Sequence, residues 1–383
     1  MTTEYDVIVV GVGIMGAVSA AALARRGVRV LGLDRYDIPN HRGGSHGDTR
    51  MFRLCYYEHP DYVPLLRAAF DGWHATQQHT GRRLFHQTGG LYMAAAGREF
   101  VEAARTAAAR HGIDHEMLDH ATMAARYPQF RLPEDHIGLY EPCAGVLYAE
   151  RAVSTFAELA CRAGAELRAH EPATAWTADG SGATVTTHRG TFRARRLVFA
   201  GGGWSSAIMR DAGLPVTVTR QVLGWVWPLR PGRFELGVCP AWAIDTPDGT
   251  PWYGFPLVDG APGFKLAHHY PAVPTTPDTV DRAITAADEA DFRPCLERFI
   301  PDANGPLLGI RTCLYANTPD AHFIIDRHPA HANVTIATGF SGHGFNFAPV
   351  VGEIVADLAT TGRTGHAIDF LSLRRFGGPG GPA

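Results

Sequence analysis

A glycine-rich turn near the amino terminus is the feature that most restricts how this chain can fold. The run 11–16 (GVGIMG) follows an apolar, β-branched run at 6–10 (DVIVV) and opens an alanine-rich stretch at 17–26. A second apolar run, 28–34 (VRVLGLD), comes next. This order predicts a strand, a tight turn, a helix and a second strand, the first unit of a Rossmann-like α/β sheet.

The three glycines of this turn have separate tasks. Gly11 permits the tight turn, Gly13 lets the backbone approach a pyrophosphate, and Gly16 lets the helix pack closely on the strand. Asp34 ends the second strand, where a carboxylate accepts hydrogen bonds from an adenosine ribose. A flexible loop is the alternative, but the spacing and the carboxylate favour a dinucleotide site. The free 2′-hydroxyl that this implies makes NADP a poor fit, whereas NAD and FAD both remain open.

The bulk composition restricts the class of protein and its partners. A chain of 383 residues is too long for one compact core, so two domains are expected. Hydrophobic residues make up 45%, but no apolar run approaches the roughly 18 residues that span a bilayer, so no membrane role is expected. A formal charge of −3 without a block of like charges offers no surface to nucleic acid, so a small-molecule partner is favoured.

The start of the chain and its cysteines indicate a reducing compartment. Residues 1–6 lack the basic segment of a signal peptide, so a cytoplasmic location is expected. The six cysteines lie far apart without a C-x-x-C pair. Neither a zinc site nor a redox dithiol is therefore indicated, and each cysteine is expected as a reduced thiol.

Further α/β signals recur along the chain. Helices are predicted at 152–163 and 349–359. The strands predicted around them are, in chain order, 165–169, 183–187, 191–194, 197–200 and 334–337. The second and third of these strands form a hairpin, and a glycine triplet, 201–203, follows the fourth.

The domains are predicted to be discontinuous. Between about 214 and 308 the chain is rich in Pro, Trp and Phe with alternating strand-like runs, which indicates an antiparallel sheet. We assign this stretch, with an earlier insert, to a substrate domain. The predicted division is a dinucleotide-binding domain of residues 1–83, 141–213 and 309–376, a substrate domain of residues 84–140 and 214–308, and a disordered tail at 377–383.

Several separate motifs resemble one enzyme family. They are 43–50 (GGSHGDTR), 252–256 (WYGFP), 263–266 (GFKL), 313–315 (CLY), 320–326 (DAHFIID) and 339–345 (GFSGHGF). Together they are similar to monomeric sarcosine oxidase and N-methyltryptophan oxidase, FAD-dependent amine oxidoreductases of the D-amino acid oxidase-like superfamily. The resemblance implies an α/β (α+β) fold, with a Rossmann-like FAD-binding domain and a discontinuous substrate domain on an antiparallel sheet. It also implies a monomer.

The resemblance implies FAD bound covalently through its 8α-methyl group to Cys313. Without it, a lone cysteine in an apolar stretch is read as a small buried hydrophobe. Arg50 and His46 resemble the family's basic groups near the flavin, and positive charge there would lower the pKa of a thiol. The cofactor contacts that the resemblance implies are Gly11, Gly13, Ile14, Met15, Gly16, Asp34, Arg35, Ser45, His46, Thr49, Arg50, Ala173, Gly201, Gly202, Trp204, Cys313, Gly342, His343, Gly344, Phe345 and Asn346.

The resemblance also implies a catalytic pocket. Lys265 matches a lysine that, with water, promotes the reaction with oxygen, because a buried ammonium stabilises negative charge developing on oxygen. His269 and Tyr253 match residues on the substrate side of the flavin. Arg53 matches an arginine that holds the substrate carboxylate by paired hydrogen bonds, and Tyr315 matches a further pocket residue. Catalytic roles are thus expected for Lys265, His269, Arg50 and Tyr253, and substrate contacts for Arg53, Tyr253, His269, Tyr315 and Asn346.

One position departs from the family. Its motif continues Gly-His-Gly-Phe-Lys, with the lysine as a second cation for the carboxylate, and here the position is Asn346. The loss of a charge-assisted hydrogen bond costs about 1.5–3 kcal/mol. Small amino acids such as sarcosine are therefore expected to bind weakly, or the substrate differs. Trp242 and Trp252 indicate either a more aromatic pocket or core packing.

The predicted activity is oxidation of a secondary amine, an N-methyl, N-alkyl or cyclic amino acid, to an imine, with molecular oxygen as acceptor and hydrogen peroxide as product. The residues single out no general base. Four alternatives remain: a dehydrogenase with another acceptor, an enzyme acting on a larger biosynthetic intermediate, a flavin-binding protein without amine oxidation, and a nicotinamide-dependent dehydrogenase.

Overall fold

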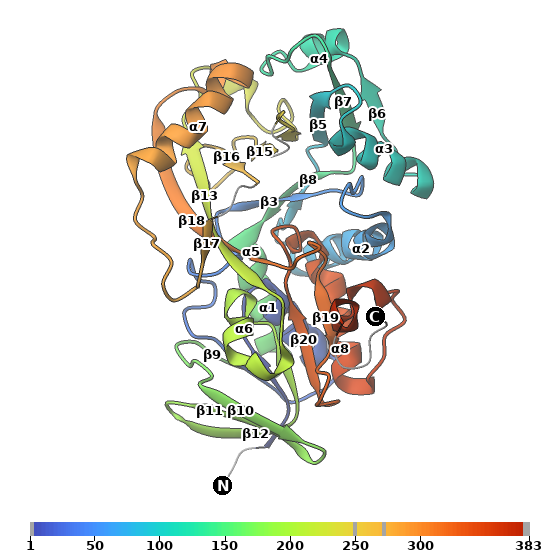
Figure 1. The fold of residues 1–383 in the computed structure, drawn as a ribbon, viewed down its shortest axis with the longest axis vertical. Coiled ribbons are helices and arrows are strands. Elements are labelled where there is room, and N and C mark those ends of the chain that lie inside the picture. The colour runs from blue at the N-terminus through green and yellow to red at the C-terminus, as the bar shows by residue number, and fades with distance from the viewer. Residues whose placement is uncertain (1–3, 248–250, 270–272, 378–383) are drawn as a thin grey trace.

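The computed structural model describes residues 4–247, 251–269 and 273–377. Two sheets divide the molecule: one lies in its lower part in Figure 1 and the other in its upper part, and β3 crosses between them. The predicted tail falls almost wholly outside the described residues. No helix in the described part is long and apolar enough to cross a membrane.

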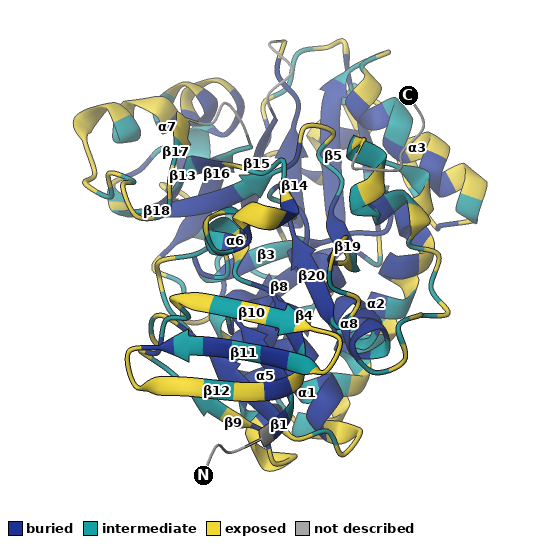
Figure 2. Ribbon diagram, turned by 60° about the horizontal axis from the view of Figure 1, so that its bottom comes forward, coloured by how far each residue is buried: buried dark blue, intermediate teal, exposed yellow. Residues whose placement is uncertain are grey.

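The lower sheet has the predicted Rossmann-like start. Its strands are β1 (Glu4–Val10), β2 (Val30–Leu33), β9 (Glu166–Arg168), β10 (Ala175–Asp179), β11 (Gly182–Thr187), β12 (Gly190–Phe199), β19 (Ile324–Arg327) and β20 (Val334–Thr338). β1 pairs in parallel with β2 and β12, and β12 in parallel with β20. The predicted hairpin is present between β11 and β12. The strands predicted at 191–194 and 197–200 are one continuous strand, β12, whose exposed half forms the hairpin and whose buried half lies beside β1 (Figure 2).

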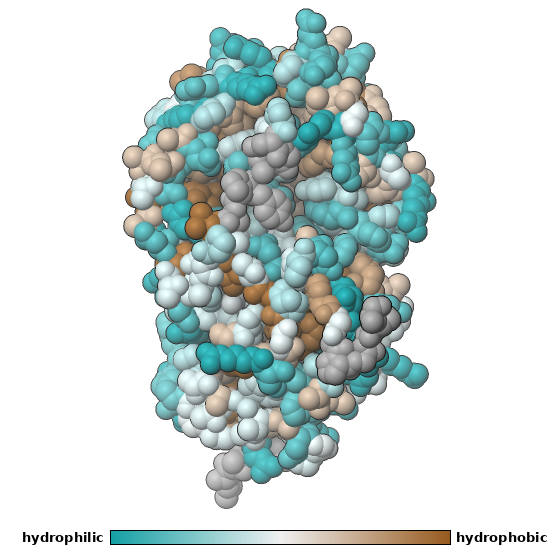
Figure 3. All heavy atoms as spheres, in the orientation of Figure 1, coloured by the Kyte–Doolittle hydropathy of each residue, from teal (hydrophilic) through white to brown (hydrophobic). Residues whose placement is uncertain are grey.

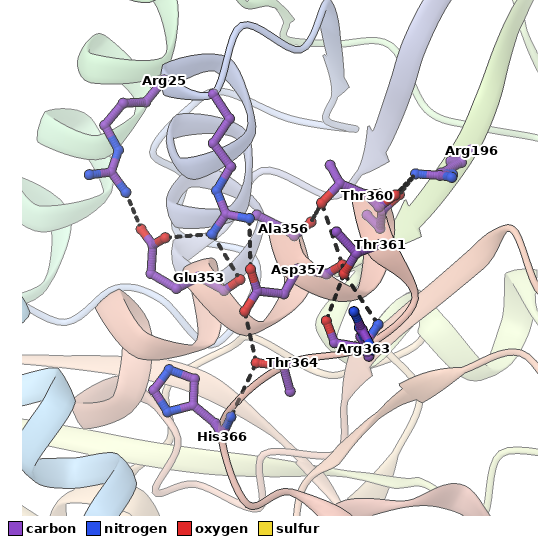
Figure 4. A network of polar contacts seen from close by, with 12 residues as sticks. Arg25, Arg196, Glu353, Ala356, Asp357, Thr360, Thr361, Arg363, Thr364 and His366 are labelled. Atoms are coloured by element: carbon purple, nitrogen blue, oxygen red, sulfur yellow. Dashed lines mark hydrogen bonds and ion pairs between the residues drawn. The ribbon is translucent and has the colours of Figure 1, made fainter.

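Three helices pack together beside this sheet. They are α1 (Ile14–Arg25), α5 (Ala149–Arg162) and α8 (Ala348–Thr361). The predicted helices at 17–26, 152–163 and 349–359 are confirmed, with α1 beginning directly after Gly13. Small residues let α1 and α8 approach, because a Cβ on Gly352 would lie 2.8 Å from the Val18 carbonyl oxygen. Arg26 pairs with Glu353 at 2.7 Å and with Asp357 at 2.8 Å at the edge of this contact. Figure 4 labels both carboxylates, with Arg25 beside Glu353.

The upper sheet is largely antiparallel, as predicted. Its path is β17 (Val273–Thr275), β13 (Thr217–Val226), β16 (Phe264–His268), β15 (Trp252–Phe255), β14 (Ala241–Ile244), β5 (Gly90–Ala95), β7 (His136–Glu141) and β6 (Glu116–Leu118). Only β14 and β5 pair in parallel among these neighbours. They join the segments 84–140 and 214–308, so both parts of the predicted substrate domain share one sheet. Helices α3 (Glu99–His111), α4 (His120–Arg126) and α7 (Ala286–Phe299) also belong to this half (Figure 1).

One strand departs from the predicted division of the chain. β18 (Leu307–Asn317) pairs with β13 from Thr217↔Asn317 to Val226↔Leu307, so it belongs to the upper sheet by hydrogen bonding. The sequence placed residues from 309 onward with the dinucleotide-binding domain. A strand pattern does not reveal its partner, and this partner lies about ninety residues away along the chain. The division into domains as a whole stays a prediction.

A small third sheet lies between the two large ones. It consists of β3 (Thr49–Phe52), β4 (Phe85–His86) and β8 (Gly145–Tyr148), with α2 (Val63–Thr80) nearby. β3 carries the motif residues Thr49 and Arg50 into the region where the halves meet (Figure 1). On the face drawn in Figure 3, polar side chains predominate and apolar ones gather across the middle of the molecule.

Candidate active site

A cavity of about 370 Å³ opens at the carboxyl ends of β1 and β2. The glycine turn forms one wall. Gly11 has φ 89°, and a Cβ there would lie 2.7 Å from the Ala200 carbonyl oxygen, so only glycine fits. The α1 amide of Ile14 donates to Ser45 Oγ at 3.1 Å at the helix N-terminus, a site suited to an anion. The backbone can therefore cradle a pyrophosphate in this cavity.

Asp34 closes the far end of the turn. Its Oδ2 accepts the Val12 N–H at 2.7 Å and its Oδ1 accepts the Tyr36 N–H at 2.9 Å. Burial raises the pKa of this carboxyl, although the backbone N–H groups oppose the shift. Each oxygen keeps further lone pairs that can accept a ribose hydroxyl, and this role of Asp34 stays a prediction.

Most of the predicted cofactor contacts line this cavity. They are Gly11, Gly13, Ile14, Met15, Asp34, Arg35, Ser45, Arg50, Ala173, Gly201, Gly202, Trp204, Gly342, Gly344 and Phe345. Gly16, His46, Thr49, Cys313, His343 and Asn346 do not line it. Gly16 serves packing instead, since a Cβ there would lie 1.8 Å from the Gly11 carbonyl oxygen.

Sequence reasoning missed several lining residues. Asp278 accepts from Trp204 Nε1 at 3.0 Å and from Arg35 Nη1 at 2.8 Å, so a loop far along the chain reaches the rim. Gly43 and Gly44 belong to a quoted motif and could have been found from it. Leu314, Phe340 and Ser341 also lie in quoted motifs, Val12 lies in the glycine turn, and Gly203 in the glycine triplet. The others come from segments without a motif: Val10, Leu33, Tyr36, Pro39, Asn40, Val153, Pro172, Thr174, Ala200, Ala207, Ile208, Ala316 and Ala337.

A second, smaller cavity of about 70 Å³ adjoins the first. The two share four lining residues, Arg50, Tyr315, Gly342 and Phe345. Gly342 has φ 79°, and a Cβ there would lie 2.3 Å from the Tyr315 ring, so glycine keeps this boundary narrow. A group bound at the boundary would contact both cavities.

The second cavity collects the predicted substrate residues. Arg53, Tyr253, His269, Tyr315 and Asn346 all line it, although they come from five separate segments. Its other lining residues are Met51, Tyr57, Tyr92, Phe100, Ala243, Pro251 and His343. Trp242 and Trp252 do not line it: Trp242 stacks on Phe264 and Trp252 on His268, which supports core packing.

His269, Tyr253 and Tyr315, which lie beside the boundary, are uncharged. His269 Nδ1 lies 3.2 Å from Tyr315 Oη, and Tyr253 Oη lies 3.5 Å from the same oxygen. Burial lowers the pKa of His269 to about 3, so the imidazole is neutral at ordinary pH. Burial also raises the pKa of Tyr253 and that of Tyr315. These residues offer hydrogen bonds without charge.

Arg53 is already paired with a carboxylate. Its Nη1 lies 2.8 Å from Glu58 Oε2, and its Nη2 contacts Glu58 Oε1. The guanidinium lies over the rings of Tyr56 and Tyr57, at 4.2 and 4.3 Å. The Arg53 charge lowers the pKa of the buried Glu58 carboxyl against the effect of burial. Sequence reasoning did not predict Glu58, because its partner is identified only by geometry.

Lys265 is buried, lies against the start of β3, and lines neither cavity. Its Nζ donates to the Gly47 carbonyl at 2.6 Å and to the Thr49 carbonyl at 2.9 Å. It also lies 5.1 Å from the Phe255 ring centroid. Burial, and then the charge of Arg50, hold the pKa of this amine well below its ordinary value.

Arg50 supplies the positive charge beside Cys313. Its Nη2 lies 3.8 Å from the Cys313 sulfur, which lies 3.8 Å from the Gly43 carbonyl oxygen. The same guanidinium donates to the carbonyl groups of Thr49, Gly44 and His46 at 2.6–2.8 Å. Cys313 itself is buried on β18, next to lining residue Leu314.

The structure does not favour His46 as a source of positive charge, and its role stays a prediction. It is fully buried, and neither ring nitrogen has a hydrogen-bond partner in the described part of the chain. Burial and the neighbouring Arg50 lower the pKa of His46 to about 3. His343 is also held: its Nε2 lies 2.9 Å from the Ala321 carbonyl oxygen and its Nδ1 contacts Tyr56 Oη. Burial lowers the pKa of His343 too.

The family model for FAD-dependent oxidoreductases (DAO) matches residues 6–358. The chain belongs to this family. Monomeric sarcosine oxidase of Streptomyces avermitilis is 41% identical over 98% of this chain and 99% of its own length. N-methyl-L-tryptophan oxidase of Citrobacter koseri is 34% identical over 97% and 99%. The sequence resemblance is thereby confirmed.

Solved structures confirm the fold. NikD, described as an unusual amino acid oxidase essential for nikkomycin biosynthesis, has a TM-score of 0.85 at 27% identity and covers 97% of this chain and 98% of its own. An L-proline dehydrogenase from P. horikoshii has a TM-score of 0.85 at 23% identity, with 98% of each chain covered, and shows the fold alone. The large cavity has a backbone cradle suited to a pyrophosphate and the Asp34 carboxylate, and so fits the FAD that the family requires.

We expect Asp34→Ala to lower the share of purified protein that carries FAD. The substitution removes the proposed ribose acceptor and leaves the N–H groups of Val12 and Tyr36 without their carboxylate, a cost of about 1–3 kcal/mol for each orphaned group. Flavin absorbance relative to protein, measured on freshly purified samples, checks this. Asp37→Ala is the control, because Asp37 is exposed and does not line the cavity. Equal flavin content in both variants would show that Asp34 does not hold the cofactor.

Proposed function

We propose that this chain is an oxidase of a secondary amine, an N-methyl, N-alkyl or cyclic amino acid. The products are an imine, which water hydrolyses, and hydrogen peroxide. The observation that carries the proposal is the second cavity, where Arg53, His269 and Tyr253 converge beside residues that also line the FAD cavity. The names of the relatives support a secondary amine as substrate and a monomer as the working form.

The residues of the second cavity favour the reactive form of an amine. FAD, when bound, accepts a hydride equivalent from the carbon next to the amine nitrogen. The amine must be the free base, and a pocket of aromatic rings and neutral hydrogen-bonding groups disfavours the ammonium form. Tyr253, Tyr315 and neutral His269 orient the nitrogen by hydrogen bonds, and no protein base is assigned.

Arg53 is proposed to orient a carboxylate, and Lys265 to serve the reaction with oxygen. A substrate carboxylate must share the guanidinium of Arg53 with Glu58, whose buried charge already uses both terminal nitrogens. Lys265 lies outside the substrate cavity and holds a positive charge, when protonated, in a water-poor environment. Binding and oxygen reduction therefore fall to different groups.

Anaerobic mixing with matched amines tests the proposed activity. We expect N-methyl amino acids to bleach the flavin absorbance and the corresponding primary amino acids to bleach it at least about tenfold more slowly. Admission of air should then restore the absorbance with one peroxide for each amine oxidised. Absence of bleaching across N-alkyl and cyclic amines would contradict the proposal. Bleaching without peroxide would instead indicate a dehydrogenase with another electron acceptor.

The neutral side chain at position 346 is proposed to weaken carboxylate binding. Asn346 is buried and lines the second cavity, and its side-chain amide makes no hydrogen bond within the described residues. We expect Asn346→Lys to lower the KM for small N-methyl amino acids by about tenfold or more, because a charge-assisted hydrogen bond is gained. Asn346→Gln keeps the neutral amide and serves as the control. An unchanged KM in the lysine variant would favour a larger substrate whose polar group contacts the amide.

Cys313 is proposed as the covalent tether of FAD. Among the six cysteines it alone accepts a hydrogen bond from a guanidinium in the described part of the chain, and positive charge favours the thiolate. We expect flavin colour to stay with the acid-precipitated wild-type protein and to be released from Cys313→Ser. Cys55→Ser, at a buried cysteine that does not line the FAD cavity, should retain it. Release from the wild type would remove the covalent claim and leave FAD binding intact.

A further inference from the structure

A three-residue turn with an unusual backbone precedes β3. The Thr49 N–H donates to the Gly47 carbonyl at 2.8 Å, which closes a turn of the γ type around Asp48. Asp48 has φ 67°, a left-handed conformation that few residues other than glycine adopt. Such a turn persists only where its surroundings hold it. The contacts that hold this one point to its role.

A carboxylate holds the turn from one side. Glu150 lies in the first helical turn of α5. Its Oε1 accepts the Gly47 N–H at 2.7 Å, and its Oε2 accepts the Asp48 N–H at 3.0 Å. The Ala149 N–H also donates to the Asp48 carbonyl at 2.9 Å, so the start of α5 is bonded to the turn at three points.

The Lys265 amine holds the turn from the other side. Its Nζ donates to the carbonyl groups of Gly47 and Thr49, which flank Asp48. One peptide group, the Gly47 carbonyl with the Asp48 N–H, therefore connects the Glu150 carboxylate to the Lys265 amine. Hydrogen bonds in such a chain strengthen one another, because a carboxylate on the N–H makes the carbonyl a better acceptor.

We propose that Glu150 is a positioning residue that holds and charges Lys265 through this peptide group. The inference rests on the proposed function, in which Lys265 serves the reaction with oxygen. That reaction passes two electrons from the reduced cofactor and two protons to O2, giving hydrogen peroxide. A protonated Lys265 has three N–H donors, and two are used by the turn. The third is left to face the charge that develops on oxygen.

The charged neighbours of Lys265 determine whether loss of the Glu150 charge raises or lowers the pKa of the amine. Burial and Arg50 on β3 lower the pKa of the amine, and the carboxylates of Asp48 and Glu150 raise it; Cys313 raises it only as a thiolate, a charge that the proposed bond to FAD removes. His46, close enough for its own pKa to be lowered by Lys265, is neutral. Removal of the Glu150 charge thus lowers the pKa of Lys265 further. The ammonium form is then lost at a lower pH, and any step that needs it slows from that lower pH upward.

The test separates reoxidation from amine oxidation. Holoenzyme reduced with dithionite is mixed with oxygenated buffer over a range of pH, so that no amine substrate is needed. We expect Glu150→Gln to reoxidise about tenfold more slowly at neutral pH and to shift the fall in rate to lower pH. Amide hydrogen exchange at Gly47 and Asp48 should become faster in the same variant, in protein with and without FAD. Glu150→Asp, which keeps the charge, should recover much of the rate.

Glu158 provides a matched control for Glu150. Glu158→Gln makes the same chemical change on the same helix, where Glu158 pairs with Arg82 and Arg162 at the surface, and should alter neither readout. Unchanged reoxidation with faster exchange would show that the turn does not govern Lys265. Unchanged exchange would show that Glu150 does not hold the turn, and either result overturns the inference. Failure of the amine proposal would appear separately, as absence of anaerobic bleaching by amines.

Discussion

The hydrogen bonds of the partly buried Arg50 guanidinium are the interactions around which this site is arranged. It donates to three backbone carbonyls of the 44–49 segment, approaches the Cys313 sulfur on β18, and lies 5.8 Å from the Phe345 ring centroid. It also lines both cavities. A charge in such a place is stable only when its donors are satisfied. One side chain therefore contacts three elements: the 44–49 segment, strand β18, and the glycine-rich loop before α8.

Low polarity around this arginine determines the charge of its neighbours. His46 and His269 are neutral, and the pKa of the Lys265 amine lies well below its ordinary value. Arg53 keeps its charge because Glu58 pairs with it. A flavin enzyme that binds an amine benefits from this pattern, because a cavity with little net charge does not stabilise the unreactive ammonium form. The charge on Arg53 is stabilised by its ion pair with Glu58 rather than by contact with water.

The parts of the site that lie within one short segment could be predicted from the sequence. The contacts between segments far apart in the sequence could not. Gly11, Gly13, Gly16 and Asp34 act within one strand–turn–helix unit, so their spacing alone indicates their tasks. The family resemblance supplied Arg53, Tyr253, His269, Tyr315 and Asn346 of the second cavity, although only Tyr253 and Tyr315 lie within the quoted segments. The strand of Cys313 was assigned to the other half of the chain, since its partner β13 is set by long-range pairing. His46 was expected as a cation because burial is not visible in a motif.

Glu58 and Glu150 illustrate the same limit in another way. Each is an ordinary acidic residue in the sequence, and each meets its partner only in the folded chain: Glu58 at Arg53, Glu150 at the turn that holds Lys265. In the proposed mechanism Glu58 affects the binding of the substrate carboxylate, and Glu150 affects the reaction with oxygen. Arg53 and Asn346 face the substrate cavity, whereas Lys265 lies against the start of β3 and lines neither cavity. Under the proposed function, a change of residue at 346 can therefore alter which amine is bound without disturbing Lys265, the group proposed to serve the reaction with oxygen.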